Sequence, residues 1–122
     1  MVWPDDNYGY IRRLNSPAEN TRKGGSGVYY HASYWGRPHD YLWLSTTNPA
    51  LMREEMVKAW NANAKEIWVL NVGDIKPAEY QTQLFLDMAF DITPFQQSDF
   101  VNQHLTSWYQ KYFKKMGKRL QM

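Results

Sequence analysis

Three short apolar runs along the chain have the length and composition of β-strands. They cover residues 1–3, residues 27–32 and residues 66–72. The third run is almost continuously apolar, a pattern that is typical of a strand covered on both faces. We therefore predict three strands, the last of which has both faces buried.

Three further segments carry apolar residues at helical spacing. Asn48 can cap the first helix and Pro49 suits its first turn, while Ala62 to Lys65 closes it. Pro77 opens the second helix, and Ser98 with Asp99 caps the third. The apolar positions of the three helices are, in turn, Leu51, Met52, Met56, Ala59 and Trp60; Tyr80, Leu84, Phe85 and Met88; and Val101, Leu105, Trp108, Tyr109 and Tyr112.

The order of these elements favours an α/β fold. Strands that are separated by helical segments form right-handed parallel βα units. Three strands make a poor closed domain, whereas they fit well into part of an eight-stranded barrel. We therefore predict about three parallel strands with flanking helices, as a fragment of one (β/α)8, or TIM-type, barrel domain that takes in residues 1–122. In such barrels the chemistry lies where strands end and loops begin.

Composition excludes several classes of protein. Hydrophobic residues make up 43% and charged residues 21% of the 122 residues, which is a globular composition. The net charge of +2 gives no argument for nucleic acid, and no apolar run approaches the roughly 18 residues of a membrane span. Cysteine is absent, so thiol chemistry and Cys–zinc sites are excluded. Aromatic residues, at 16%, are abundant enough to serve a core, an interface or a sugar-binding surface.

Polar and ionisable residues follow each predicted strand. Asp5 and Asp6 follow the first, Tyr30 and His31 end the second with His39, Asp40 and Tyr41 beyond it, and Asn71 and Asp74 follow the third. Converging carboxylates suit glycoside cleavage, which needs one group to protonate the leaving oxygen and another to activate water or attack the sugar. The same residues could equally cap turns and a helix. A metal site from His31, His39, Asp40 and Asp74 matches no compact ligand motif, so we predict no metal.

Three blocks of this sequence resemble glycoside hydrolase family 115. The first runs from Trp3 to Leu14 and contains Pro4-Asp5-Asp6-Asn7. The second runs from Gly24 to His31 and continues through residues 33–36 and 38–44, and the third runs from Asn71 to Tyr80, followed by residues 85–89. The resemblance covers roughly residues 3–90, is looser over 91–110, and fades after Tyr109.

Membership of this family implies removal of glucuronic acid, or its 4-O-methyl ether, from α-1,2 linkages to the xylose units of xylan, with inversion and without a cofactor. Asp5 or Asp6 would be the catalytic carboxylate. Arg12 or Arg13 would meet the uronate carboxylate through a planar fork. The sugar would be bound or oriented by Tyr30, His31, His39 and Tyr41, and the pocket would be lined from the neighbouring strand by Asn71 and Asp74.

Family members are far longer than 122 residues, so we expect this chain to be an internal fragment of a secreted or periplasmic enzyme. Its partners would then be xylan or a glucuronoxylo-oligosaccharide and the remainder of the barrel. Alone it would be inactive and fold poorly, because the inward side chains Val28, Tyr30, Ile67 and Val69 would lack partners. A non-catalytic sugar-binding module and an unrelated α/β interaction domain are the alternatives.

Overall fold

The structure is a computed structural model that describes residues 1–37 and 45–120, without the side chains of 115–120. Its strands are β1 (Val2–Pro4), β2 (Gly27–His31) and β3 (Ile67–Asn71). Its helices are α1 (Pro49–Asn61), α2 (Glu79–Phe90) and α3 (Phe100–Leu120), and two 3-10 helices, η1 (Glu19–Thr21) and η2 (Thr93–Gln96), lie in the connections. All three predicted strands and all three predicted helices are present.

The strands form one parallel sheet in the order β1-β2-β3. This confirms the predicted α/β fold with about three parallel strands and flanking helices. Because the strands are parallel, their carboxyl ends meet at one edge of the sheet. There, His31 at the end of β2 is in register with Asn71 at the end of β3, and Asp5 follows β1 directly.

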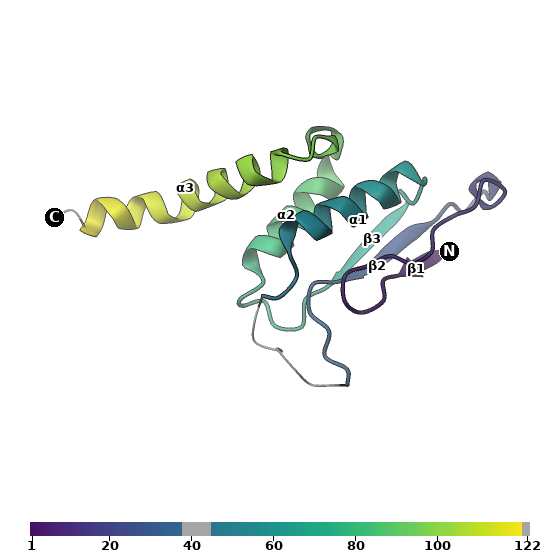
Figure 1. Cartoon of the computed structure of the whole chain (residues 1–122), viewed down its shortest axis with the longest axis horizontal. Helices are drawn as coiled ribbons and strands as arrows, with labels where there is room; N and C mark the ends of the chain where they lie inside the picture. The colour runs from purple at the N-terminus through teal and green to yellow at the C-terminus, as the bar shows by residue number, and fades with distance from the viewer. Residues whose placement is uncertain (38–44, 121–122) are drawn as a thin grey trace.

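Helices α1 and α2 pack on one face of the sheet (Figure 1). Val28 and Tyr30, which are fully buried, face these helices, and Trp68 pairs with Val28 on the same side. Ile67 lies on the opposite face and is 52% exposed, and Val69 on that face is half-buried. Within this chain only one face of β3 is covered, and the described residues do not provide the burial predicted for its second face. Side chains alternate along a strand, and here the helices cover only one of the two sets.

The same alternation corrects a second expectation. Val28 and Tyr30 do not share a face with Ile67 and Val69, and both are fully buried against the helices, so the expectation that all four lack partners is wrong for Val28 and Tyr30. In the register of the sheet Tyr29, rather than Tyr30, pairs with Val69.

The helix boundaries follow local capping. The Oδ1 of Asn48 accepts a hydrogen bond from the backbone N–H of Ala50 at 2.8 Å, which confirms the predicted cap of α1. Helix α2 begins at Glu79 and not at Pro77, because residues 75–78 form a turn in which the Ala78 N–H donates to the carbonyl of Ile75.

The core lies between the sheet and the two helices. Its largest fully buried side chains are Tyr30, Phe85, Met52, Met56, Leu84, Met88 and Val28. Arg53 of α1 is also buried, and its guanidinium donates to the carbonyls of Phe95 and Gln96 at 2.8 Å each. This contact ties α1 to η2, the short helix that leads into α3.

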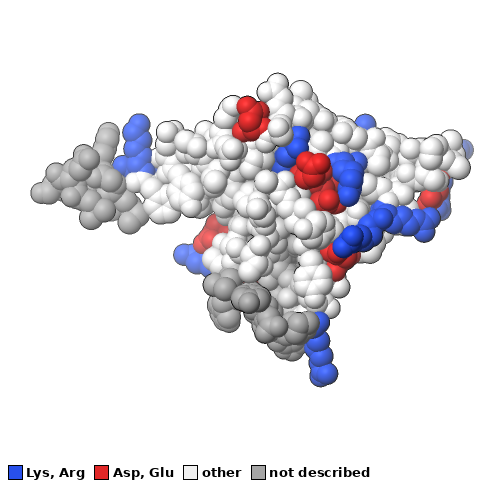
Figure 2. Space-filling view, viewed as in Figure 1, with Lys and Arg blue, Asp and Glu red and all other residues white. Residues whose placement is uncertain are grey.

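Helix α3 packs on the core through its first half, where Phe100, Leu105 and Trp108 lie against the core cluster (Figure 1). Val101 is buried, whereas Tyr109 is 52% exposed. The predicted apolar stripe is thus covered only in part. No helix in the described ranges is both long enough and apolar enough to cross a membrane. On the face seen in Figure 2, acidic and basic side chains lie beside one another, and much of the remaining surface is uncharged.

Candidate functional site

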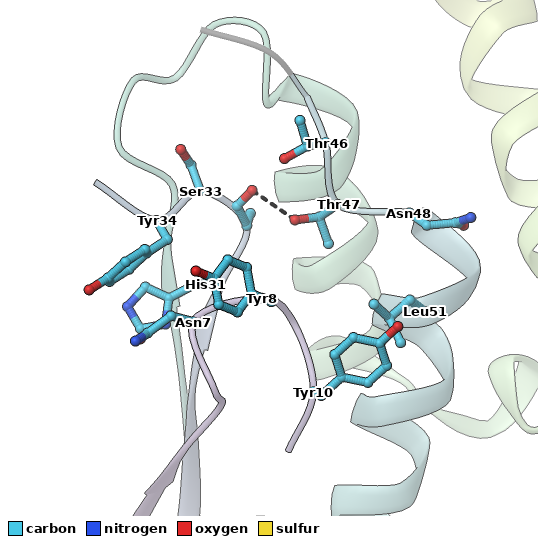
Figure 3. Close-up of a pocket in the computed structure, with 11 residues that line it drawn as sticks. Asn7, Tyr8, Tyr10, His31, Ser33, Tyr34, Thr46, Thr47, Asn48 and Leu51 are labelled. Carbon is cyan, nitrogen blue, oxygen red and sulfur yellow. Dashed lines mark hydrogen bonds between the residues drawn. The ribbon is translucent and has the colours of Figure 1, made fainter. Parts of the chain in front are cut away.

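A pocket of about 510 Å³ opens at the carboxyl ends of β1 and β2 (Figure 3). Three segments form it: the loop after β1, the end of β2 with the residues that follow it, and the residues that lead into α1 with its first turn. Its walls combine three tyrosine rings with hydroxyl, amide and imidazole groups. The lining residues are Asn7, Tyr8, Tyr10, His31, Ala32, Ser33, Tyr34, Thr46, Thr47, Asn48 and Leu51. Rings beside many hydrogen-bonding groups suit a polar ligand with apolar faces, such as a sugar.

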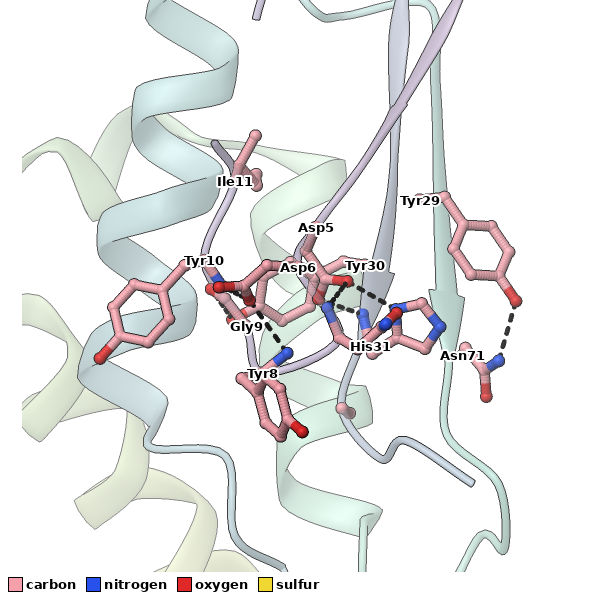
Figure 4. Close-up of polar contacts among 12 residues, drawn as sticks. Asp5, Asp6, Tyr8, Gly9, Tyr10, Ile11, Tyr29, Tyr30, His31 and Asn71 are labelled. Atoms are coloured by element: carbon pink, nitrogen blue, oxygen red, sulfur yellow. Dashed lines mark hydrogen bonds and ion pairs between the residues drawn. The ribbon is translucent and has the colours of Figure 1, made fainter. Parts of the chain in front are cut away.

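His31 is held in the pocket wall by Asp5 (Figure 4). The carboxylate lies 2.6 Å from the Nδ1 of His31 and accepts the backbone N–H of the same residue at 2.9 Å. The Asp5 side chain is 0% exposed and that of His31 is 12% exposed. A carboxylate oxygen accepts a hydrogen bond from Nδ1 when that nitrogen carries a proton, so this contact assigns the Nδ1–H tautomer to His31. The imidazole is therefore fixed in one tautomer and one orientation.

Further contacts fix this pair. Asp5 also accepts the N–H of Asn7 at 3.0 Å, and its own N–H donates to the carbonyl of Tyr29 at 3.1 Å. The His31 ring packs edge-on against Tyr29 and Tyr34. The pair thus joins the end of β1 to the end of β2.

Asp6 closes the turn that forms one wall of the pocket. Its Oδ1 accepts the N–H groups of Tyr8 and Tyr10 at 3.0 and 3.1 Å, and its Oδ2 pairs with Arg12 at 3.0 Å. Burial acts to raise the pKa of Asp6, but the hydrogen bonds from Tyr8, Tyr10 and Arg12 outweigh it and leave the pKa below its usual value. Asp6 therefore remains ionised and shapes the loop.

Gly9 allows this turn to approach the core. Its φ is +93°, and a Cβ at this position would lie 2.8 Å from the hydroxyl oxygen of Tyr30. That hydroxyl donates to the Gly9 carbonyl at 3.0 Å. Burial, with the nearby charge of Asp5, raises the pKa of Tyr30 well above its ordinary value. Tyr30 is 0% exposed, so the predicted contact between Tyr30 and a sugar is incompatible with its place in the core.

The remaining predicted residues are dispersed. Asn71 reaches the same sheet edge as Asp5 and His31, but its amide donates to the hydroxyl of Tyr29 at 2.8 Å, away from the Asp5–His31 pair (Figure 4). Asp74 is exposed in the turn beyond β3.

The two arginines lie outside the pocket lining. The side chain of Arg12 is 75% exposed beside Tyr10, and that of Arg13 pairs with Glu19 at 3.3 Å. His39 and Tyr41 lie outside the described residues, as does Asp40 of the weighed metal site. In the described part of the chain, no three His, Asp or Glu side chains come together as a metal site would require.

Comparison with known proteins places this sequence and this geometry in one family. The family model described as glycosyl hydrolase family 115 matches residues 1–121. The chain belongs to glycoside hydrolase family 115. The match continues through α3, so the expectation that the resemblance fades after Tyr109 is wrong. No curated protein matches the chain.

Eleven chains of solved structures match this family 115 sequence. One of them is described as a family 115 4-O-methyl-α-glucuronidase with specificity for decorated arabinogalactans. It is 54% identical, with a TM-score of 0.83 over 89% of this chain. The chain spans 14% of the length of that protein.

Several pocket residues of this family 115 chain were not predicted from the sequence. Tyr8 and Tyr10 lie inside the first family block, yet their ring positions follow from the turn that Asp6 closes. Asn48 was identified only as a helix cap and Leu51 only as an apolar helix position. Their spacing of three residues was the available signal, because it places both on one side of the first turn of α1.

Proposed function

We propose that this chain contributes part of the active site of a family 115 hydrolase that removes 4-O-methylglucuronic acid, or glucuronic acid, from a glycan. The observation that carries the proposal is the buried Asp5–His31 pair in the wall of a pocket lined by tyrosines and hydroxyl groups, in a chain of this family. A sugar ring can lie against Tyr8, Tyr10 or Tyr34 while its hydroxyl groups meet the polar lining. The chemistry needs no cofactor, because proton transfer and water attack can be performed by side chains.

The substrate we propose first is xylan, with cleavage of the α-1,2 linkage between the uronic acid and xylose and with inversion at the anomeric carbon. A decorated arabinogalactan is the second candidate. The specificity described for the solved family member, which is 54% identical, favours it. The enzyme would act outside the cytoplasm, where such polysaccharides occur.

The two aspartates predicted to be catalytic have different roles in this proposal. Asp5 has no exposed side-chain surface, so it acts through His31 by holding the imidazole toward the sugar. Asp6, 22% exposed, keeps the pocket loop in shape and holds Arg12, whose free guanidinium edge is our candidate for the uronate carboxylate. Asn71 and Asp74 stay candidates for contacts with the glycan at the same sheet edge, as do His39 and Tyr41.

We further propose that the sheet is part of a (β/α)8 barrel domain whose remaining strands complete the pocket. The parallel strand order and the helices on a single face support this. In such barrels the helices lie outside and the inner faces of the strands pack together. The half-covered face with Tyr29, Ile67 and Val69 would then line the interior.

A chimera tests the function. In a complete enzyme, this chain replaces the matching segment of the solved family member, and release of 4-O-methylglucuronic acid is measured from glucuronoxylan and from decorated arabinogalactan. Proton NMR of the first product formed reports whether the anomeric configuration is inverted. Asp5→Asn and Asp6→Asn should each lower turnover at least about a hundredfold, because they displace the imidazole and the pocket loop that they hold, with the exposed Asp99→Asn as control.

In the same chimera Arg12→Ala should raise KM with little change in kcat, because it removes binding of the ground-state carboxylate. No release from either glycan by a folded chimera would contradict the proposed function. Near-normal turnover of both aspartate variants would contradict their proposed roles.

A further inference from the structure

Two side chains of α1 form hydrogen bonds with the backbone of Ile11, in the loop after β1. The N–H of Ile11 donates to the Oε2 of Glu55 at 2.8 Å, and the Nζ of Lys58 donates to the Ile11 carbonyl at 3.1 Å. Glu55 and Lys58 are themselves paired at 2.6 Å, one helical turn apart. Both backbone groups of one loop residue are thus bound by side chains that are 44 and 47 residues away in sequence.

The contact between Glu55 and Ile11 is buried. The Glu55 side chain is 8% exposed, and Ile11 is 4% exposed as a member of the core cluster. The buried carboxylate is matched by a cation and by a backbone donor, so its charge is compensated. Ile11 would otherwise have a buried N–H without a partner, which is costly.

The loop that contains Ile11 also carries Tyr8 and Tyr10, which form the tyrosine wall of the pocket. Tyr8 and Tyr10 lie just before Ile11, in the turn closed by Asp6, and the hydroxyl of Tyr30 in β2 donates to the Gly9 carbonyl of the same turn. Leu51, which lines the pocket, lies one turn of α1 before Glu55 and on the same side of the helix. The two contacts of Glu55 and Lys58 with Ile11, which we call the clamp, join the loop that carries the tyrosine wall to helix α1.

We propose that Glu55, together with Lys58, is a positioning residue that sets the width of the sugar pocket through Ile11, without touching the substrate. This inference rests on the proposed function for the identity of the ligand. It does not rest on it for the clamp itself.

Amide hydrogen exchange, followed residue by residue by NMR on the chain, tests the clamp directly. Glu55→Met removes the acceptor but keeps side-chain length, and Glu54→Met is the matched control because Glu54 is its neighbour on α1 with a 68% exposed side chain. The Ile11 amide should exchange at least about tenfold faster in Glu55→Met, as expected for loss of a hydrogen bond to a charged group. Exchange at Val28, a fully buried residue of β2, corrects for any general loss of stability.

Glu55→Gln separates geometry from charge. Its side-chain oxygen can still accept from Ile11, so this variant should retain most of the Ile11 protection. Lys58→Met, which keeps the acceptor and removes the second contact, should give an intermediate effect. Equal acceleration of Ile11 and Val28 in Glu55→Met would overturn the clamp and leave Glu55 a general stabilising residue.

The consequence for the pocket is measured by kinetics in the complete chimeric enzyme with glucuronoxylan or decorated arabinogalactan. Glu55→Met should raise KM about tenfold while kcat falls less than about threefold, and Glu55→Gln should restore KM. A fall in kcat at unchanged KM, or the same rise in KM with Glu54→Met, would overturn the positioning role. If the unaltered chimera releases no uronic acid, the proposed function fails, and hydrogen exchange still decides the clamp.

Discussion

The buried carboxylate of Asp5 offers a sharp test of the site, because Asp5→Asn changes one oxygen into a donor at nearly constant shape. Its Oδ1 accepts from the N–H of Asn7 and from His31 Nδ1, and its Oδ2 accepts from the N–H of His31. All three partners are donors. An asparagine amide turns its NH₂ toward one of them if it replaces Oδ2 and toward two of them if it replaces Oδ1.

Both orientations of the amide leave a defect. If the NH₂ takes the place of Oδ2, it faces the N–H of His31, and that buried donor is unpaired. If the NH₂ takes the place of Oδ1, His31 can switch tautomer so that its Nδ1 accepts from the NH₂. The N–H of Asn7 then faces a donor and loses its acceptor. Each outcome replaces charge-assisted hydrogen bonds with neutral ones and leaves one donor without a partner. We expect a loss of about 2–4 kcal/mol in the free energy of unfolding.

Urea denaturation of the chain measures this loss, with Asp74→Asn as the control. Asp74 is exposed, so its variant should stay within about 0.5 kcal/mol of the unaltered chain. Nitrogen NMR of the imidazole provides a second readout, since His31 should carry its proton on Nδ1 in the unaltered chain. A change below about 0.5 kcal/mol in Asp5→Asn, or a proton on Nε2 alone in the unaltered chain, would refute the hydrogen-bonded pair.

Three further predictions concern stability. Burial, and after it the charge of Asp87, raises the pKa of Tyr80 to about 12 from an ordinary 10.0. The contribution of Tyr80 to the free energy of unfolding is therefore complete below pH 10 and is lost as pH rises toward 12. In melting experiments at increasing pH, Tyr80→Phe should flatten this alkaline decline. The pKa of Asp6 is lowered, so its contribution is present above the ordinary value of 3.8 and is lost as pH falls through the native value; an Asp6→Asn chain that is equally acid-sensitive would contradict this. Phe85→Ala should cost about 3–5 kcal/mol in urea titrations because Phe85 is 1% exposed. Phe90→Ala, at a residue that is 93% exposed, should cost less than about 0.5 kcal/mol, and similar losses for both would contradict the packing.

Local signals predicted the three strands and the three α-helices, although not the first residue of α2 or the two 3-10 helices. The Asn48-Pro49 cap predicted the first residue of α1 because capping depends on neighbouring backbone groups alone. The apolar runs predicted all three strands to within one or two residues. The family blocks, which are also local, identified the family that the comparisons show.

The pairing of distant residues was not available from such signals. Asp5 and His31 are 26 residues apart, and the sequence indicated only that both follow or end a strand. In the sequence, nothing distinguishes Glu55 from any other polar residue of a helix. Only the packing of α1 against the loop brings it to Ile11. These contacts depend on how elements meet, which periodicity within one element does not encode.

The sequence by itself determined the kind and order of the main elements, the parallel arrangement of β2 and β3 through a helical connection, and the family. Only the tertiary structure decided which side chains of each strand meet the helices. A period of two divides a strand into two sets but does not say which set is covered. For this reason Tyr29 and Tyr30, adjacent and chemically identical, differ: one bonds to Asn71 on the more open face, and the other is buried in the core against Gly9.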